Sequence, residues 1–159
     1  MSPTAADTAV RASIDVDAPP ERAFELFTAE IGRWWSPDHH IIEAELAEMV
    51  FEPRVGGHIY DRGVDGSECR WARVLAYEPP HRVVFSWDIT TSWQVETDPS
   101  RASEVHVTFT PDGAGGTLVQ LEHRHLDRHG EGWAGVREAV GSDGGWPSGL
   151  RRLAEHLTA

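Results

Sequence analysis

Two spacings of hydrophobic residues divide the chain into stretches of predicted strand and predicted helix. Apolar side chains occupy every second position between residues 10 and 16, which is the period of a half-buried strand. From residue 17 to 35 the period lengthens to three or four, as in an amphipathic helix. Pro19 and Pro20 suit a first helical turn, and Gly32 interrupts the pattern. We therefore expect one strand followed by two short helices.

The middle of the chain returns to a period of two, and turns rich in glycine and proline interrupt it at regular intervals. Six further strands are predicted at residues 49–52, 58–63, 68–77, 82–89, 103–109 and 117–125. Successive short strands joined by tight turns predict an antiparallel meander. Residues 90–102 form the one long connection, and long loops in compact domains are often lids or binding loops.

A second helical region ends the chain. Helical spacing begins at Trp133, and one apolar stripe then continues to the end. The stripe consists of Trp146, Leu150, Leu153 and Leu157. This order of elements predicts an α+β helix-grip fold: a curved antiparallel sheet of about seven strands wraps around a long C-terminal helix, with the two short helices between strands one and two. No repeat or linker divides the chain, so we expect a single domain over 1–159 with its core at about 9–157.

Charge and cysteine content narrow the possible partners and location. The net charge is −12, and the acidic residues are scattered, so nucleic acid and anionic membranes are poor partners. The single cysteine, Cys69, excludes an internal disulfide, and the first ten residues lack the basic and apolar regions of a signal peptide. No apolar run reaches the length of a membrane span. We expect a cytoplasmic protein that is a monomer or a homodimer.

Several stretches together resemble the START-like (SRPBCC) superfamily. Within it they are most similar to proteins related to the C-terminal domain of the activator of heat shock protein 90 ATPase. The stretches are "RAFELFTAEIGRWW", "FEPRVGGHIYDR", "WARVLAYEPPHRVVFSW", "SEVHVTFTPDGAGGTLVQLEH" and "DGGWPSGLRRLAEHL". The resemblance implies a helix-grip fold with a hydrophobic cavity between the concave face of the sheet and the last helix. It implies less about function, because the superfamily includes lipid binders, polyketide cyclases, hormone receptors and chaperone cofactors.

Large aromatic and histidine side chains are the candidates for the walls of this cavity. Phe85 and Trp87 share one face of a predicted strand, and adjacent helical side chains at Trp34 and Trp35 diverge by ~100°, so that one of the two can enter the core while the other faces the cavity mouth or solvent. The predicted ligand-binding residues are Trp35, Tyr60, Trp71, Phe85, Trp87, His123, His125 and Trp146.

His123 and His125 lie two residues apart on the last predicted strand, so their side chains would share one face. Three interpretations stay open. They are core residues with satisfied hydrogen bonds, polar anchors that orient a ligand in an apolar cavity, or metal ligands assisted by His58 or His129. No spacing places a third ligand, so we expect no metal and no cofactor. His39 and His40 are interpreted as exposed loop residues.

The sequence leaves three functions to distinguish. The first is binding of a small apolar or aromatic ligand between sheet and helix without turnover. The second is a chaperone-cofactor-like interaction module, which predicts an exposed apolar patch instead of an internal cavity. The third is a cyclase or small-molecule hydrolase with His123 or His125 as base, which predicts a perturbed histidine on the cavity wall paired with an acid.

Overall fold

A computed structural model describes residues 8–35 and 41–157. Seven antiparallel strands form one sheet in the order β1-β7-β6-β5-β4-β3-β2. The strands are β1 (Val10–Val16), β2 (Leu46–Phe51), β3 (His58–Gly63), β4 (Glu68–Glu78), β5 (Arg82–Trp87), β6 (Ser103–Pro111) and β7 (Thr117–Arg124). The helices are α1 (Pro20–Phe27), α2 (Ile31–Trp34), α3 (Trp133–Gly141) and α4 (Trp146–Leu157), with 3-10 turns η2 (Pro99–Arg101) and η3 (Leu126–His129). The predicted helix-grip fold is confirmed.

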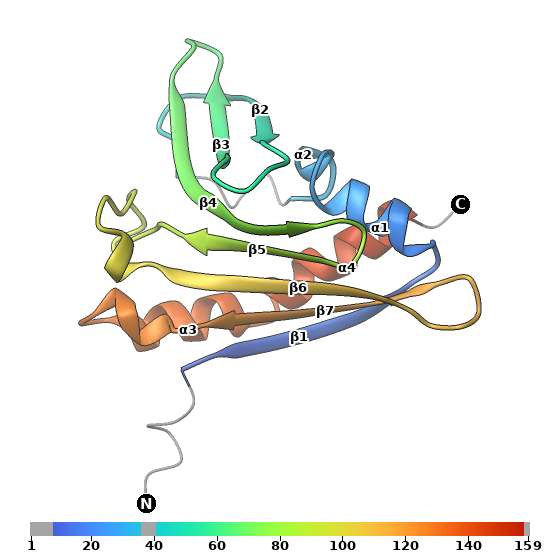
Figure 1. Cartoon of the computed structure of the whole chain (residues 1–159). Helices are drawn as coiled ribbons and strands as arrows, with labels where there is room; N and C mark the ends of the chain where they lie inside the picture. The colour runs from blue at the N-terminus through green and yellow to red at the C-terminus, as the bar shows by residue number, and fades with distance from the viewer. Residues whose placement is uncertain (1–7, 36–40, 158–159) are drawn as a thin grey trace, which may run out of the picture.

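The sheet is strongly curved along β4. In Figure 1, β2, β3 and the first half of β4 rise steeply from the plane formed by the other strands. The register of β4 against β5 shifts between Val74 and Ala76, and such irregularities bend a strand. The curvature creates the concave face on which the site is built.

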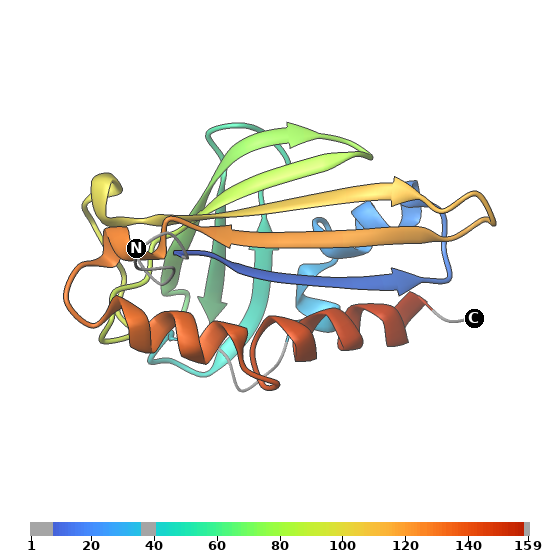
Figure 2. The same cartoon turned by 90° about the horizontal axis from the view of Figure 1, so that it is seen from below.

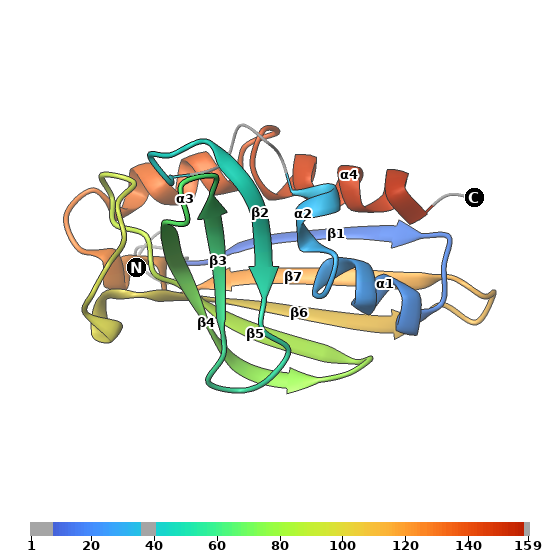
Figure 3. The same cartoon turned by 90° about the horizontal axis from the view of Figure 1, so that it is seen from above.

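Helices α3 and α4 follow one another along the sheet, as Figure 2 shows. Helix α4 contacts mainly β1, while α2 lies against both β2 and α4. Figure 3 shows α1 and α2 lying beside β2. The concave face is therefore covered by helices from both ends of the chain.

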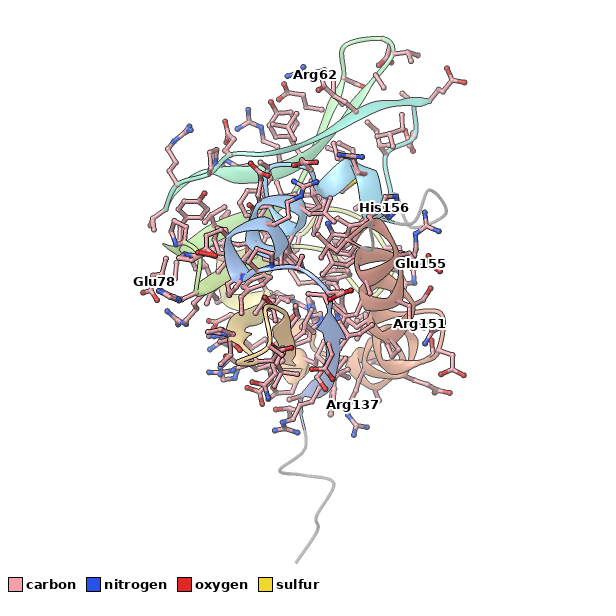
Figure 4. The ribbon with its side chains drawn as sticks, turned by 90° about the vertical axis from the view of Figure 1, so that its right-hand side faces the viewer. Arg62, Glu78, Arg137, Arg151, Glu155 and His156 are labelled. Carbon is pink, nitrogen blue, oxygen red and sulfur yellow. The ribbon has the colours of Figure 1, made fainter. Side chains whose placement is uncertain are left out.

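The apolar stripes predicted from the sequence form the core. Phe24 and Phe27 of α1 contact Phe109 of β6, with ring centroids 5.2 and 5.7 Å apart. The predicted stripe of α4 is buried at Trp146, Leu150, Leu153 and Leu157. Figure 4 labels polar side chains on the outside of the molecule, among them Arg151, Glu155 and His156 on the outer side of α4. Both helices therefore turn one apolar side inward.

The C-terminal helical region is divided into α3 and α4 by a turn at residues 142–145. The backbone N–H of Gly145 donates to the carbonyl oxygen of Ser142 at 2.9 Å. A Cβ atom on Gly145 would lie 2.2 Å from the carbonyl oxygen of Val140, which no real side chain tolerates. Only glycine fits this close approach of two backbone segments, and α4 starts at the next residue.

Strand β7 is shorter than the sequence predicted. It ends at Arg124, and the next residue, His125, has φ 62°, in the left-handed region. His125 therefore does not continue the face occupied by His123, and the expected pairing of these two side chains was wrong. His39 and His40 lie outside the described residues.

Candidate functional site

A cavity of about 390 Å³ lies between the concave face of the sheet and the C-terminal helices. Six of the seven tryptophans of the chain line it. They are Trp34, Trp35, Trp71, Trp87, Trp93 and Trp146. The other described lining residues are Ile41, Asp61, Ile89, Ala139, Val140, Gly144, Gly145 and Gly149. The wall is thus aromatic and apolar, with one ionisable side chain among the described lining residues.

Four of these tryptophans form a closed ring of contacts. The centroids are 5.1 Å apart for Trp35 and Trp71, 5.7 Å for Trp71 and Trp87, 5.6 Å for Trp87 and Trp146, and 5.7 Å for Trp146 and Trp35. Three of the four contacts are edge-to-face, a favourable geometry for aromatic pairs. We refer to these four residues as the tryptophan ring.

Each member of the tryptophan ring comes from a different part of the fold. Trp71 and Trp87 occupy inward positions on β4 and β5, and the backbone N–H of Asp88 donates to the carbonyl oxygen of Trp71 at 2.8 Å. Trp35 follows α2, and Trp146 begins α4. The ring therefore exists only when sheet and helices have assembled.

A buried series of hydrogen bonds links Trp146 to His123, Ser103 and His129. The indole Nε1–H of Trp146 donates to Nδ1 of His123 at 3.1 Å. Because an indole N–H can only donate, Nδ1 carries no proton, and Nε2–H of His123 donates to the Ser103 hydroxyl at 2.7 Å. The Ser103 hydroxyl in turn donates to Nε2 of His129 at 2.7 Å. The hydrogen bonds therefore run in one direction, with Trp146, His123 and Ser103 each donating to the next group and His129 accepting the last bond.

Burial keeps both histidines of this series neutral. His123 is fully buried, and desolvation, with a smaller contribution from His129, lowers its pKa to about 3. Desolvation also lowers the pKa of His129. A neutral His123 is what the Trp146 contact requires, because a protonated Nδ1 could not accept its hydrogen bond.

His123 does not reach the cavity itself. Its ring lies against Trp87 and Trp146, at centroid distances of 5.1 and 6.0 Å, and these two residues line the cavity. The perturbed histidine expected of an enzyme is present, yet its hydrogen bonds go to Ser103 and Trp146, with no carboxylate among them. Of its three interpretations, the structure supports a core residue with satisfied hydrogen bonds that positions Trp146.

The structure brings four of the predicted site residues to the cavity, namely the tryptophan ring. Phe85 lies in the core behind Trp71, with centroids 6.2 Å apart. Tyr60 faces the opposite side of β3, where its hydroxyl accepts a hydrogen bond from Arg62 at 3.0 Å and its ring lies near the guanidiniums of Arg62 and Arg70. Tyr60 and Phe85 therefore do not line the cavity.

Sequence reasoning missed Asp61, which the strand alternation places inward because Tyr60 faces outward. Its side chain is 1% exposed and lines the cavity. It also missed Trp93, which the long loop contributes, and it left the role of Trp34 open. The available signal for Asp61 was its position directly after Tyr60, because successive side chains of a strand point to opposite faces.

Among the described residues, the cysteine thiol is not activated and no cluster of metal ligands is found. Cys69 lies opposite Asp61 in the β3–β4 register, and burial, together with the Asp61 charge, raises the pKa of its thiol to about 11. The thiolate, which is the nucleophilic form, is therefore scarce at neutral pH. In the ranges 8–35 and 41–157, no group of three or more His, Cys, Asp or Glu side chains could hold a metal ion. None of the described helices is long and apolar enough to cross a membrane.

Solved structures similar to this chain include a synthase and a resistance protein. An anthrahydroquino-gamma-pyrone synthase, Txn09, is 42% identical, with 92% of this chain and 95% of that chain covered and a TM-score of 0.66. CalC, a self-sacrificing resistance protein from Micromonospora echinospora, is 29% identical over 95% of this chain and 94% of that chain, with a TM-score of 0.67. Protein NE0264 from Nitrosomonas europaea is 17% identical over 98% and 97%, with a TM-score of 0.68, and shows the fold alone.

The family comparison covers most of the chain. No curated protein sequence matches it significantly. The sequence model for "Activator of Hsp90 ATPase homolog 1-like protein" matches residues 17–158, from the end of β1 through α4. This range includes every residue of the tryptophan ring. The chain therefore belongs to the family of Activator of Hsp90 ATPase homolog 1-like proteins, with the START-like fold.

Proposed function

We propose that the protein binds a small, flat aromatic molecule in the cavity lined by the tryptophan ring. The observation that carries this proposal is that six tryptophans line one cavity. Indole rings offer large, rigid apolar faces that stack on a planar ligand. A volume of about 390 Å³ lies within the range of small-molecule sites.

The similarity to Txn09 supports the same class of ligand. The name of that protein refers to an anthrahydroquinone, a flat fused-ring aromatic, and it is 42% identical to this chain. A chaperone-cofactor role has less support. The tryptophan-lined cavity and the similarity to Txn09 both favour an internal ligand over a docking patch.

Replacing Trp35 by alanine should weaken binding of 2-hydroxyanthraquinone at least about tenfold, because one indole face of the ring is lost. Trp35 is only half-buried, so the fold should survive the change. The measurement is quenching of tryptophan fluorescence on titration of the ligand. Trp133→Ala is the matched control, since Trp133 is the tryptophan that does not line the cavity and is also half-buried. Equal affinities of the two variants would contradict the proposed site.

Binding should also appear as a gain in stability. A ligand present at about 100 times its Kd adds about 2.7 kcal/mol to the free energy of unfolding. Thermal unfolding of the wild type with and without the anthraquinone measures this gain. A wild type that shows neither quenching nor a rise in Tm with any anthraquinone would refute the proposal.

A second candidate function is ring closure on the bound aromatic, which the 42% identity to a pyrone synthase favours. In such a reaction, a phenol oxygen forms a C–O bond to the distal ketone carbon of an ortho-hydroxyaryl 1,3-diketone. The ketone oxygen then leaves as water, and the product is a γ-pyrone. The cavity would contribute by holding the reacting groups close together. His123 is not the base of this reaction, because Trp87 and Trp146 separate it from the cavity.

This candidate is tested with 1-(2-hydroxyphenyl)butane-1,3-dione. If the protein is a cyclase, it should accelerate the loss of one water to give 2-methylchromone, as followed by mass spectrometry. Trp35→Ala should lower the rate and Trp133→Ala should not. A rate equal to that of buffer, for this diketone and for its anthraquinone analogue, would leave binding without turnover as the function.

A further inference from the structure

One charged side chain interrupts the apolar wall of the cavity. Asp61 lies on β3 with 1% of its surface exposed, and it is the only ionisable residue among the described residues that line the cavity. A carboxylate in such surroundings is costly unless hydrogen-bond donors surround it.

The neighbours of Asp61 come from both adjacent strands. In the register, Met49 of β2 and Cys69 of β4 lie opposite it. Trp71 is two residues beyond Cys69 and therefore faces the same side of the sheet. Asp61 and Trp71, a member of the tryptophan ring, thus line the cavity from neighbouring strands.

A carboxylate has two oxygens and about four acceptor positions, so it can hold a ligand donor in addition to its partners within the protein. An ionised acceptor forms stronger hydrogen bonds than a neutral one, especially where water is excluded. With 1% of its surface exposed, Asp61 is already shielded from water, so a ligand group that contacts it is favoured when it can donate a hydrogen bond. The position of Asp61 therefore favours ligands that carry a donor at the edge of the ring.

The donor best suited to this geometry is a phenolic hydroxyl. It lies in the plane of the aromatic ring, so that stacking and hydrogen bonding occur together.

We propose that Asp61 accepts a hydrogen bond from a phenolic hydroxyl of the bound aromatic and so makes the cavity selective for hydroxylated fused-ring ligands. This inference rests on the proposed function, that is, on aromatic binding in the same cavity. It adds the chemical class of the ligand and the residue that recognises it.

The experiment compares 2-hydroxyanthraquinone with 2-methoxyanthraquinone, which has the same ring system without the donor. Both are titrated at pH 6, where the phenol is protonated, with tryptophan fluorescence as the readout. The wild type should bind the hydroxy compound at least about tenfold more tightly. Because this comparison uses the wild type, it does not depend on whether a variant folds.

Variants of Asp61 then assign the selectivity to one side chain. Asp61→Asn keeps the size but removes the charge, and it should reduce the preference to about threefold or less. Asp61→Leu removes the acceptor and should abolish or reverse the preference. Asp15→Asn is the matched control, because it removes one charge from an exposed position on β1, and it should keep the wild-type preference.

The outcomes separate this inference from the proposed function. Equal binding of the two anthraquinones by the wild type, or an unchanged preference in Asp61→Leu, overturns the role of Asp61 and leaves aromatic binding intact. Failure of both compounds to bind overturns the proposed function and this inference with it. A tenfold preference that disappears in Asp61→Leu and persists in Asp15→Asn supports the proposal.

Discussion

Replacing Gly145 by alanine should lower the free energy of unfolding by at least about 3 kcal/mol, or about 6–12 °C in Tm for a domain of this size. The new Cβ would lie 2.2 Å from the carbonyl oxygen of Val140 and 2.5 Å from its carbonyl carbon. Both atoms belong to the backbone of α3, so no side-chain rotation relieves the clash. The junction between α3 and α4 must shift, and with it Trp146, the first residue of α4.

The adjacent residue provides a matched control. A Cβ on Gly144 would meet nothing within 4 Å, so Gly144→Ala should change stability by no more than about 0.5 kcal/mol. Urea denaturation of the two variants measures the difference directly. Similar stabilities of Gly145→Ala and Gly144→Ala would show that the α3–α4 junction is not as closely packed as described.

The second large expected effect is a loss of stability at acidic pH. His123 is neutral when folded, with a pKa of about 3, whereas in the unfolded chain it has the ordinary value of 6.5. Below pH 6.5 the unfolded state therefore binds a proton that the folded state does not. The contribution of the buried, neutral His123 to the free energy of unfolding is therefore complete above pH 6.5. It is lost as the pH falls from 6.5 toward 3. From this group alone, the free energy of unfolding should fall by about 1.4 kcal/mol per pH unit within that window.

The contribution of His123 is isolated by comparison with His123→Gln. Urea denaturation between pH 4.5 and 6 should give a slope that is flatter in this variant by about 1.4 kcal/mol per pH unit. His81→Gln, at an exposed position, should keep the wild-type slope. If His123→Gln does not fold, the ring signals of His123 in the wild type provide the test by NMR. A titration of those signals near pH 6.5 would disprove the buried neutral state.

Alternation and periodicity were sufficient to predict most of the fold. The seven strands and the stripe of α4 follow from which positions can be apolar, and that information is local. The same alternation should have placed Asp61 inward and Tyr60 outward on β3. Strand phase, not aromatic character, decides which side chains of β3 reach the cavity, so Asp61 lines it and Tyr60 does not.

The remaining differences arise where the chain leaves regular geometry. A continued strand would place His125 on the face of His123, whereas β7 ends at Arg124 and His125 has φ 62°. Division of the C-terminal region at Gly145 depends on contact with Val140, which periodicity does not record. A hydrophobic period of 2 or 3.6 residues identifies a strand or a helix, but it does not indicate at which residue that element ends.

By itself, the sequence determined the order of the elements and the presence of enough aromatic residues to line a cavity. Tertiary structure alone decided that six tryptophans meet at one cavity and that His123 lies against two of them. The physical reason is distance along the chain: Trp35, Trp71, Trp87 and Trp146 belong to four segments whose contacts form only when β4, β5, α2 and α4 pack together. The "WW" of residues 34–35 thus acquires its role from Trp71 and Trp146, which lie 36 or more positions further along the printed sequence.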